Sequence, residues 1–115
     1  MIDTDRELLE LAAKSVGIKL EINVYGSGNY DAGFWTAYGG IERHSWNPWD
    51  PLKDDGDALR LAIKLGLMIV VWREEKMSYA GNEDWEGIFE KHQDNPAVAT
   101  RLAIIKEAAK IGRKM

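Results

Sequence analysis

Two prolines in an aromatic loop, and the apolar helical pattern that follows them, constrain this chain most. Pro48 and Pro51 disfavour helix at the residue before them and cannot donate to a strand ladder. We therefore expect no regular structure over residues 41–53. From 56 to 65 apolar side chains occupy most of a helical circumference, a pattern typical of a helix packed on more than one side. This helix is predicted to be the middle of the core.

Caps and helical periodicity predict two more helices. Thr4 and Glu7 form a capping box before an apolar pattern over residues 5–16. Asn95 followed by Pro96 begins the last helix. That helix is expected to direct four charged side chains away from its apolar arc: Lys106, Glu107, Lys110 and Lys114.

Alternation and apolar runs predict the strands. Residues 18–25 alternate strictly between apolar and polar, and residues 34–38 are aromatic enough to be the return strand of a hairpin. The apolar run 67–72 is typical of a central strand covered on both faces, and residues 73–95 hold one or two further strands. The order α-β-β-α-β-β-α predicts a single α+β domain over residues 1–115, with an antiparallel sheet and helices mainly on one face.

A weak internal repetition accompanies this order. Residues 9–14 and 59–64 are similar at a spacing of 50, and each of the two helices ends in a glycine before a strand. A duplicated αββ unit and shared helical patterning both explain the similarity.

Composition excludes several classes of function. The 115 residues contain no cysteine, which rules out disulfides and thiolate chemistry and fits a reducing cytoplasm. Residues 1–57 carry a net charge of −6 and residues 58–115 carry +2, so no broad basic face for nucleic acid is expected. The longest apolar run is too short to span a bilayer, and the acidic start lacks the basic region of a signal peptide. We expect a cytoplasmic protein without membrane contact.

Four aspartates precede or begin the central helix: Asp50, Asp54, Asp55 and Asp57. Their spacing does not match a calcium-binding loop, because Pro51 occupies the position of a required carboxylate. Carboxylates in a first helical turn accept backbone N–H bonds and oppose the helix dipole. Helix capping is therefore favoured over metal binding or acid–base catalysis, and no metal or cofactor is predicted.

Arg101 falls in the middle of the apolar arc of the last helix. A guanidinium there must reach solvent or find a carboxylate, since an unpaired buried charge is costly. We expect an ion pair with the cluster Asp54, Asp55 and Asp57. The pair either locks two helices together, which we favour, or clamps a ligand.

The histidines and glycine-rich loop suggest no catalytic motif. His44 and His92 are both expected at the surface. His44-Ser45 lacks the strand-turn-helix elbow that exposes a nucleophilic serine. Residues 26–28 lie in a hairpin loop and not in a phosphate-binding loop, because an aromatic strand follows them instead of a helix.

Two groups of residues are candidates for a binding surface. The aromatic candidates lie in the first half of the chain and, if exposed together, form a protein- or ligand-binding patch: Tyr30, Trp35, Tyr38, Trp46 and Trp49. The basic candidates leave nucleic-acid contact as a minor alternative, because they also complement a helix C-terminus: Lys106, Lys110, Arg113 and Lys114.

The run from Trp49 to Ala62 resembles a family of small uncharacterised proteins encoded by tailed phages and bacterial prophages, whose members carry a Trp-Asn-Pro-Leu…Asp-Asp-Gly-Asp-Ala-Leu-Arg-Leu-Ala motif. Residues 99–112 are similar to the last helix of that family. The doubled Trp-Pro unit at 46–51 departs from the motif. The resemblance implies a phage or prophage origin and a cytoplasmic setting in the bacterial host, and it assigns no catalytic residue.

These observations favour a non-enzymatic accessory protein that binds a host or phage protein. The alternative is a small-molecule or nucleotide site formed by the Trp46–Asp57 loop and Arg101, and an enzyme using the aspartates and His44 ranks third. The binding residues expected from the sequence are Trp46, Trp49, Asp54, Asp55 and Arg101. A homodimer is plausible if aromatic strands lie at a sheet edge, although nothing in the sequence requires it.

Overall fold

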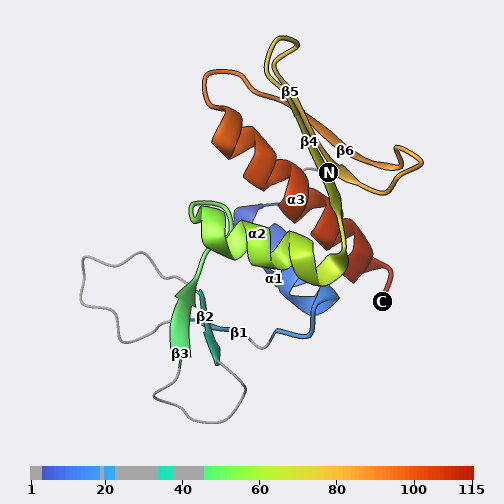
Figure 1. The fold of residues 1–115 in the computed structure, drawn as a ribbon. Helices are drawn as coiled ribbons and strands as arrows, with labels where there is room; N and C mark the ends of the chain where they lie inside the picture. The colour runs from blue at the N-terminus through green and yellow to red at the C-terminus, as the bar shows by residue number, and fades with distance from the viewer. Residues whose placement is uncertain (1–3, 19, 23–33, 38–45) are drawn as a thin grey trace.

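Helices and strands alternate in the order α-β-β-β-α-β-β-β-α along residues 4–18, 20–22, 34–37 and 46–115, which the computed structural model describes (Figure 1). The elements are α1 (Asp5–Ser15), β1 (Leu20–Ile22), β2 (Phe34–Ala37), β3 (Trp46–Trp49), α2 (Asp55–Leu65), β4 (Met68–Trp72), β5 (Met77–Gly81), β6 (Gly87–Lys91) and α3 (Pro96–Arg113). The α+β class and the antiparallel pairing are confirmed, but the strands form two sheets, ordered β1-β2-β3 and β4-β5-β6.

The helices begin where their caps predict. Thr4 accepts a hydrogen bond from the backbone of Glu7 at 3.2 Å, Asp54 caps α2, and Asn95 accepts from two backbone N–H groups of α3. Gly66 ends α2 in a left-handed conformation with φ 66°, which costs glycine no steric strain. These local signals account for the start of all three helices and for the end of α2.

β3 corrects the expectation that residues 41–53 are irregular. Trp46–Trp49 pairs antiparallel with β2, and Pro48 lies opposite Trp35. β3 is the last strand in the order β1-β2-β3, and an edge strand tolerates a proline because one side of its backbone has no ladder to complete. Residues 41–45 lie outside the described part of the chain.

α3, and not α2, is the centre of the core. It packs against α1, α2, β5 and β6, and its Ala103, Ile105 and Ala108 are fully buried. α2 packs on one side only, since Leu59 is 55% and Ile63 is 68% exposed. The larger apolar arc of α2 therefore did not identify the central helix.

The environment of α3 also corrects the position of Glu107. This side chain was expected to face away from the core, but it is buried and pairs with Lys110 at 2.7 Å. Elsewhere on α3, Gly112 lies so close to α1 that a Cβ atom would collide with the carbonyl of Leu11. No helix among the described residues is long and apolar enough to cross a membrane.

The sheet β4-β5-β6 has β5 in its middle. β4 is an edge strand, so the expectation that residues 67–72 form a central strand covered on both faces was wrong. Residues 73–95 contain two strands, β5 and β6. One face of the sheet packs on the core through Ile69, Ala80 and Ile88, which are register partners. Alternate residues of the same strands point to the opposite, outer face.

Candidate functional site

Four aromatic side chains gather on the outer face of the sheet β4-β5-β6 and its β5–β6 turn, and we call them the aromatic surface: Trp72, Tyr79, Trp85 and Phe89. Tyr79 lies opposite Phe89 in the register, and Trp72 is two residues from Val70, the partner of Tyr79 on β4. Because side chains alternate between the faces of a strand, these rings share one face. Trp85 joins them from the turn.

The rings form a small cluster of their own, separate from the main core. Tyr79 lies at its base, fully buried, with its ring centroid 4.9 Å from that of Trp85 and 4.7 Å from that of Phe89. Trp72 and Phe89 stack at 6.2 Å with an interplanar angle of 9°. The upper rings stay open to solvent, since Trp85 is 49% and Phe89 is 48% exposed. Exposed aromatic groups of this kind are typical of binding hot spots.

The β5–β6 turn is built to hold Trp85 over the sheet. The side-chain oxygen of Asn82 accepts hydrogen bonds from the backbone N–H groups of Asp84 and Glu86, at 3.0 and 2.9 Å. Trp85 itself has φ 63°, a left-handed conformation that costs a bulky residue roughly 1–2 kcal/mol. Its ring contacts, each worth about 0.5–1.5 kcal/mol, offset this strain.

Close backbone approach lets the Tyr79 ring lie flat against the sheet. Gly81 and Gly87 are register partners, and a Cβ on either would collide with the other glycine and with the Tyr79 hydroxyl. That hydroxyl donates to the carbonyl of Asn82 at 2.7 Å. Burial raises the pKa of the Tyr79 hydroxyl above its ordinary value.

Arg101 makes the ion pair that the sequence predicted. Its Nη1 lies 2.5 Å from Asp55 Oδ1, and its Nε donates to the carbonyl of Leu52 at 2.8 Å. The Arg101 side chain is only 14% exposed, whereas the Asp55 side chain is 78% exposed. Arg101 thus attaches α3 to the loop before α2, which supports the interpretation as a lock between helices.

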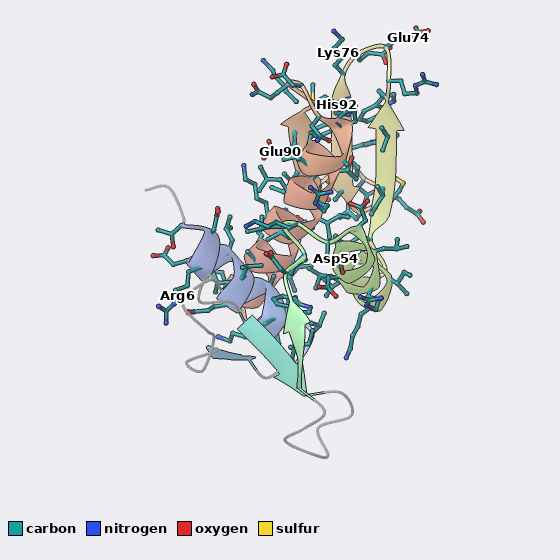
Figure 2. The ribbon with its side chains drawn as sticks, turned by 90° about the vertical axis from the view of Figure 1, so that its left-hand side faces the viewer. Arg6, Asp54, Glu74, Lys76, Glu90 and His92 are labelled. Carbon is teal, nitrogen blue, oxygen red and sulfur yellow. The ribbon has the colours of Figure 1, made fainter. Side chains whose placement is uncertain are left out.

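The other aspartates of the cluster bind backbone groups and a second arginine. Asp54, labelled at the start of α2 in Figure 2, accepts the backbone N–H of Asp57 at 3.1 Å. Asp57 accepts from the backbone of Asp50 at 2.9 Å and from Arg60 at 2.7 Å. The capping interpretation is confirmed for Asp54, and Asp55 is the member of the predicted cluster that pairs with Arg101.

The first-half aromatic candidates are not brought together as a described surface. Trp49 is 6% exposed and packs in the main core, so it offers almost no area to a partner. The side chains of Trp46 and Trp35, and the residues Tyr30 and Tyr38, lie outside what the structure describes.

His92 is buried, which corrects its expected surface position. Ser78 Oγ lies 2.8 Å from His92 Nε2 and 2.7 Å from Thr100 Oγ1, on the side of the sheet that packs against α3. Ser78 and His92 are both buried, so neither is open to a substrate. The Ser78 hydroxyl joins β5 to the segment after β6 through His92 and to α3 through Thr100. His44, Ser45 and the 26–28 loop lie outside the described residues.

Two lysines of the basic candidate group are paired within the fold: Lys106 with Glu90 and Lys110 with Glu107. Their pairing reduces the charge available to phosphates. Across the described ranges no group of three His, Asp or Glu side chains is arranged to hold a metal ion.

Comparisons with protein-family models, with curated proteins and with solved structures found no significant match to this chain. The aromatic surface must therefore be interpreted from its own geometry. The sequence shows these aromatic residues on both sides of Asn82, but only the strand register shows that their side chains converge.

Proposed function

We propose that this chain is a small non-enzymatic binding module, of phage or prophage origin, that acts on a protein partner in the bacterial cytoplasm. The observation that carries the proposal is the aromatic surface, where Trp85 and Phe89 are half exposed on a base formed by Tyr79. The motif between Trp49 and Ala62 supports the proposed origin.

A protein partner suits this surface better than the alternative ligand site around Arg101. Trp85 and Phe89 are held by ring contacts before any partner arrives, so little side-chain entropy is lost on binding. Arg101 instead donates hydrogen bonds from its Nε to the Leu52 carbonyl and from its Nη1 to Asp55, and Trp49 is buried. The alternative site has fewer groups available to a ligand.

Site-specific photo-crosslinking in the bacterial host tests this function. A photoreactive benzoylphenylalanine replaces Phe89 in one variant and Ile63 in the control, which is an exposed apolar residue on α2. We expect a discrete crosslinked protein with the probe at 89 and none at 63. A crosslink at 63 alone would move the binding surface to α2, and no protein crosslink at either position would contradict the proposed function.

The identified partner then allows a quantitative test. Trp85→Ala should weaken its binding by about 2 kcal/mol or more, roughly thirtyfold, because a truncated aromatic hot spot loses that much. Circular dichroism of the variant confirms that the fold is retained, as expected for a half-exposed residue.

A further inference from the structure

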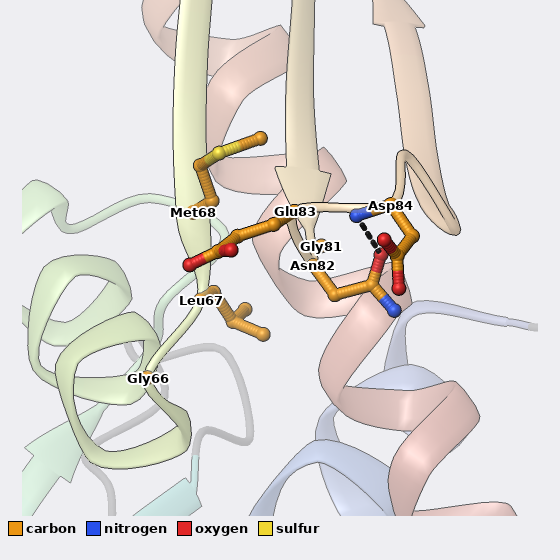
Figure 3. A pocket seen from close by; sticks show the side chains of 7 residues that line it. All are labelled: Gly66, Leu67, Met68, Gly81, Asn82, Glu83 and Asp84. Carbon is orange, nitrogen blue, oxygen red and sulfur yellow. Dashed lines mark hydrogen bonds between the residues drawn. The ribbon is translucent and has the colours of Figure 1, made fainter.

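A pocket opens at one end of the aromatic surface, between the start of β4 and the β5–β6 turn (Figure 3). It has a volume of about 450 Å³ and is lined by Gly66, Leu67, Met68, Gly81, Asn82, Glu83 and Asp84. Figure 3 shows Glu83 extending from the turn toward β4, while Leu67, just before β4, and Met68, at its start, reach toward the turn. Met68 shares the outer face with Val70 and Trp72, so the pocket and the aromatic surface are continuous.

The β5–β6 turn at the pocket is strongly acidic. Glu83, Asp84 and Glu86 lie in or beside the turn, all exposed, and residues 77–90 contain no Lys or Arg. The apolar wall from Leu67 and Met68 and the carboxylates of Glu83 and Asp84 together match an amphipathic cationic side chain. A lysine or arginine places its methylene stem on apolar surface and its charged end on carboxylates.

The size of the face favours an extended segment over a second copy of this chain. Strands of five residues span about 17 Å, and three of them are about 15 Å wide, giving a face of roughly 250 Å². A stable dimer buries about 800 Å² on each partner. β4 pairs only with β5 among the described strands, so its other edge is available to an added strand.

We propose that the partner binds through an extended segment along β4, with a lysine or arginine side chain in the pocket lined by Glu83 and Asp84. This inference rests on the proposed function and specifies the chemistry of its partner: a cationic segment, in which main-chain pairing, aromatic contact and one basic anchor act together. The electrostatic part of the binding should weaken as salt rises.

A displayed library of random heptapeptides, sorted with the labelled full chain, tests the inference. We expect the selected peptides to be enriched in Lys or Arg at one position. The double variant E83Q/D84N should bind those peptides about tenfold more weakly, since two exposed carboxylates each contribute up to about 1 kcal/mol. The matched control E74Q/E75Q makes the same charge change in the β4–β5 turn, at the far end of the sheet (Figure 2), and should leave binding within twofold.

Each other result overturns the inference. The inference is wrong if the selected peptides show no basic preference, if both double variants lose the same affinity, or if no peptide is selected. Selection of acidic peptides would exclude the pocket as a cation site. Concentration-dependent dimerisation that masks β4 would identify a second copy as the occupant. The crosslink at position 89 is independent of these outcomes, so failure of the cationic segment and failure of the proposed function are distinguishable.

Discussion

Arg101 connects two parts of the molecule that lie far apart in sequence. Its side chain is mostly buried, and both of its described contacts, with Leu52 and Asp55, are on the loop and helix that follow β3. Only one member of this group, the Asp55 carboxylate, is well solvated. The two sides of the ion pair should therefore contribute unequally to stability.

We predict that Arg101→Leu lowers the free energy of unfolding by about 2 kcal/mol, because the carbonyl of Leu52 loses a charged donor. Asp55→Asn should cost less than about 1 kcal/mol, since an exposed partner is screened by water. Urea unfolding of both variants and of the double variant measures the two losses and their coupling. An Arg101→Leu protein as stable as wild type would show that the pair does not lock the helices.

Tyr79 makes the stability of the fold depend on pH in the alkaline range. Burial raises the pKa of its hydroxyl above 10.0, so the folded state holds the phenolic proton more tightly than the unfolded chain does. The associated stability is present below pH 10 and is lost as the pH rises from there through the raised pKa.

We predict that Tyr79→Phe, which has no ionisable group, loses less stability than wild type between pH 9 and 11. Urea unfolding of both proteins across this range measures the difference between their slopes. Parallel declines would mean that Tyr79 does not titrate differently in the two states. At neutral pH the variant should be modestly less stable, because the carbonyl of Asn82 loses its donor.

At the scale of elements, α2 illustrates how an apolar pattern can be wider than the buried face. Leu61 is 3% exposed, whereas Leu59 is 55% exposed. Leu61→Ala should therefore lower the free energy of unfolding by about 2–4 kcal/mol through cavity formation. Leu59→Ala, the same change two residues away, should cost less than about 0.5 kcal/mol. Similar losses for both variants would show that α2 is buried on more than one side.

The strands were harder to predict than the helices. Helix bounds follow from local caps such as Thr4 and Asn95, which act within one turn. β3 instead depends on its edge position, since Pro48 is acceptable only where one side of the strand has no partner. A short stretch of sequence does not show whether a strand lies at the edge of its sheet.

The aromatic surface was missed for a related reason. Trp72 ends an apolar run that is typical of a buried strand, and Trp85 lies in a turn where its left-handed backbone directs the ring back over Tyr79. The rings converge through strand register, which depends on pairing between segments. By contrast, the ion pair of Arg101 with the aspartate cluster was predictable, because a charge in an apolar arc requires a partner wherever that partner lies.

At the scale of the whole molecule, the three helices lie between the two sheets, and α3 contacts both of the other helices (Figure 1). Each of the first two helices is followed by a three-stranded antiparallel sheet. The αββ unit considered from the sequence therefore lacked a strand, because each described sheet has three, and duplication stays a prediction.

The closest approach of α1 and α3 is at Gly112, against the carbonyl of Leu11. We predict that Gly112→Ala lowers the free energy of unfolding by about 2 kcal/mol or more, because the backbones must separate. Gly56→Ala is the control within a helix, since the nearest atoms to its Cβ would belong to the flexible Arg60 side chain and the Asp54 carboxylate. That variant should be neutral or more stable by up to about 1 kcal/mol. Thermal unfolding of both proteins tests the contrast.

The pairing of α1 with α3 also affects how the chain folds during its synthesis on the ribosome. Lys14 and Met115 touch across 101 residues of sequence, so α3 is synthesised long after α1. Until α3 emerges, Leu8 and Leu9, which are buried in the finished core, have no helix to cover them. Such non-local closure slows folding and leaves a nascent apolar helix exposed to chaperones during synthesis.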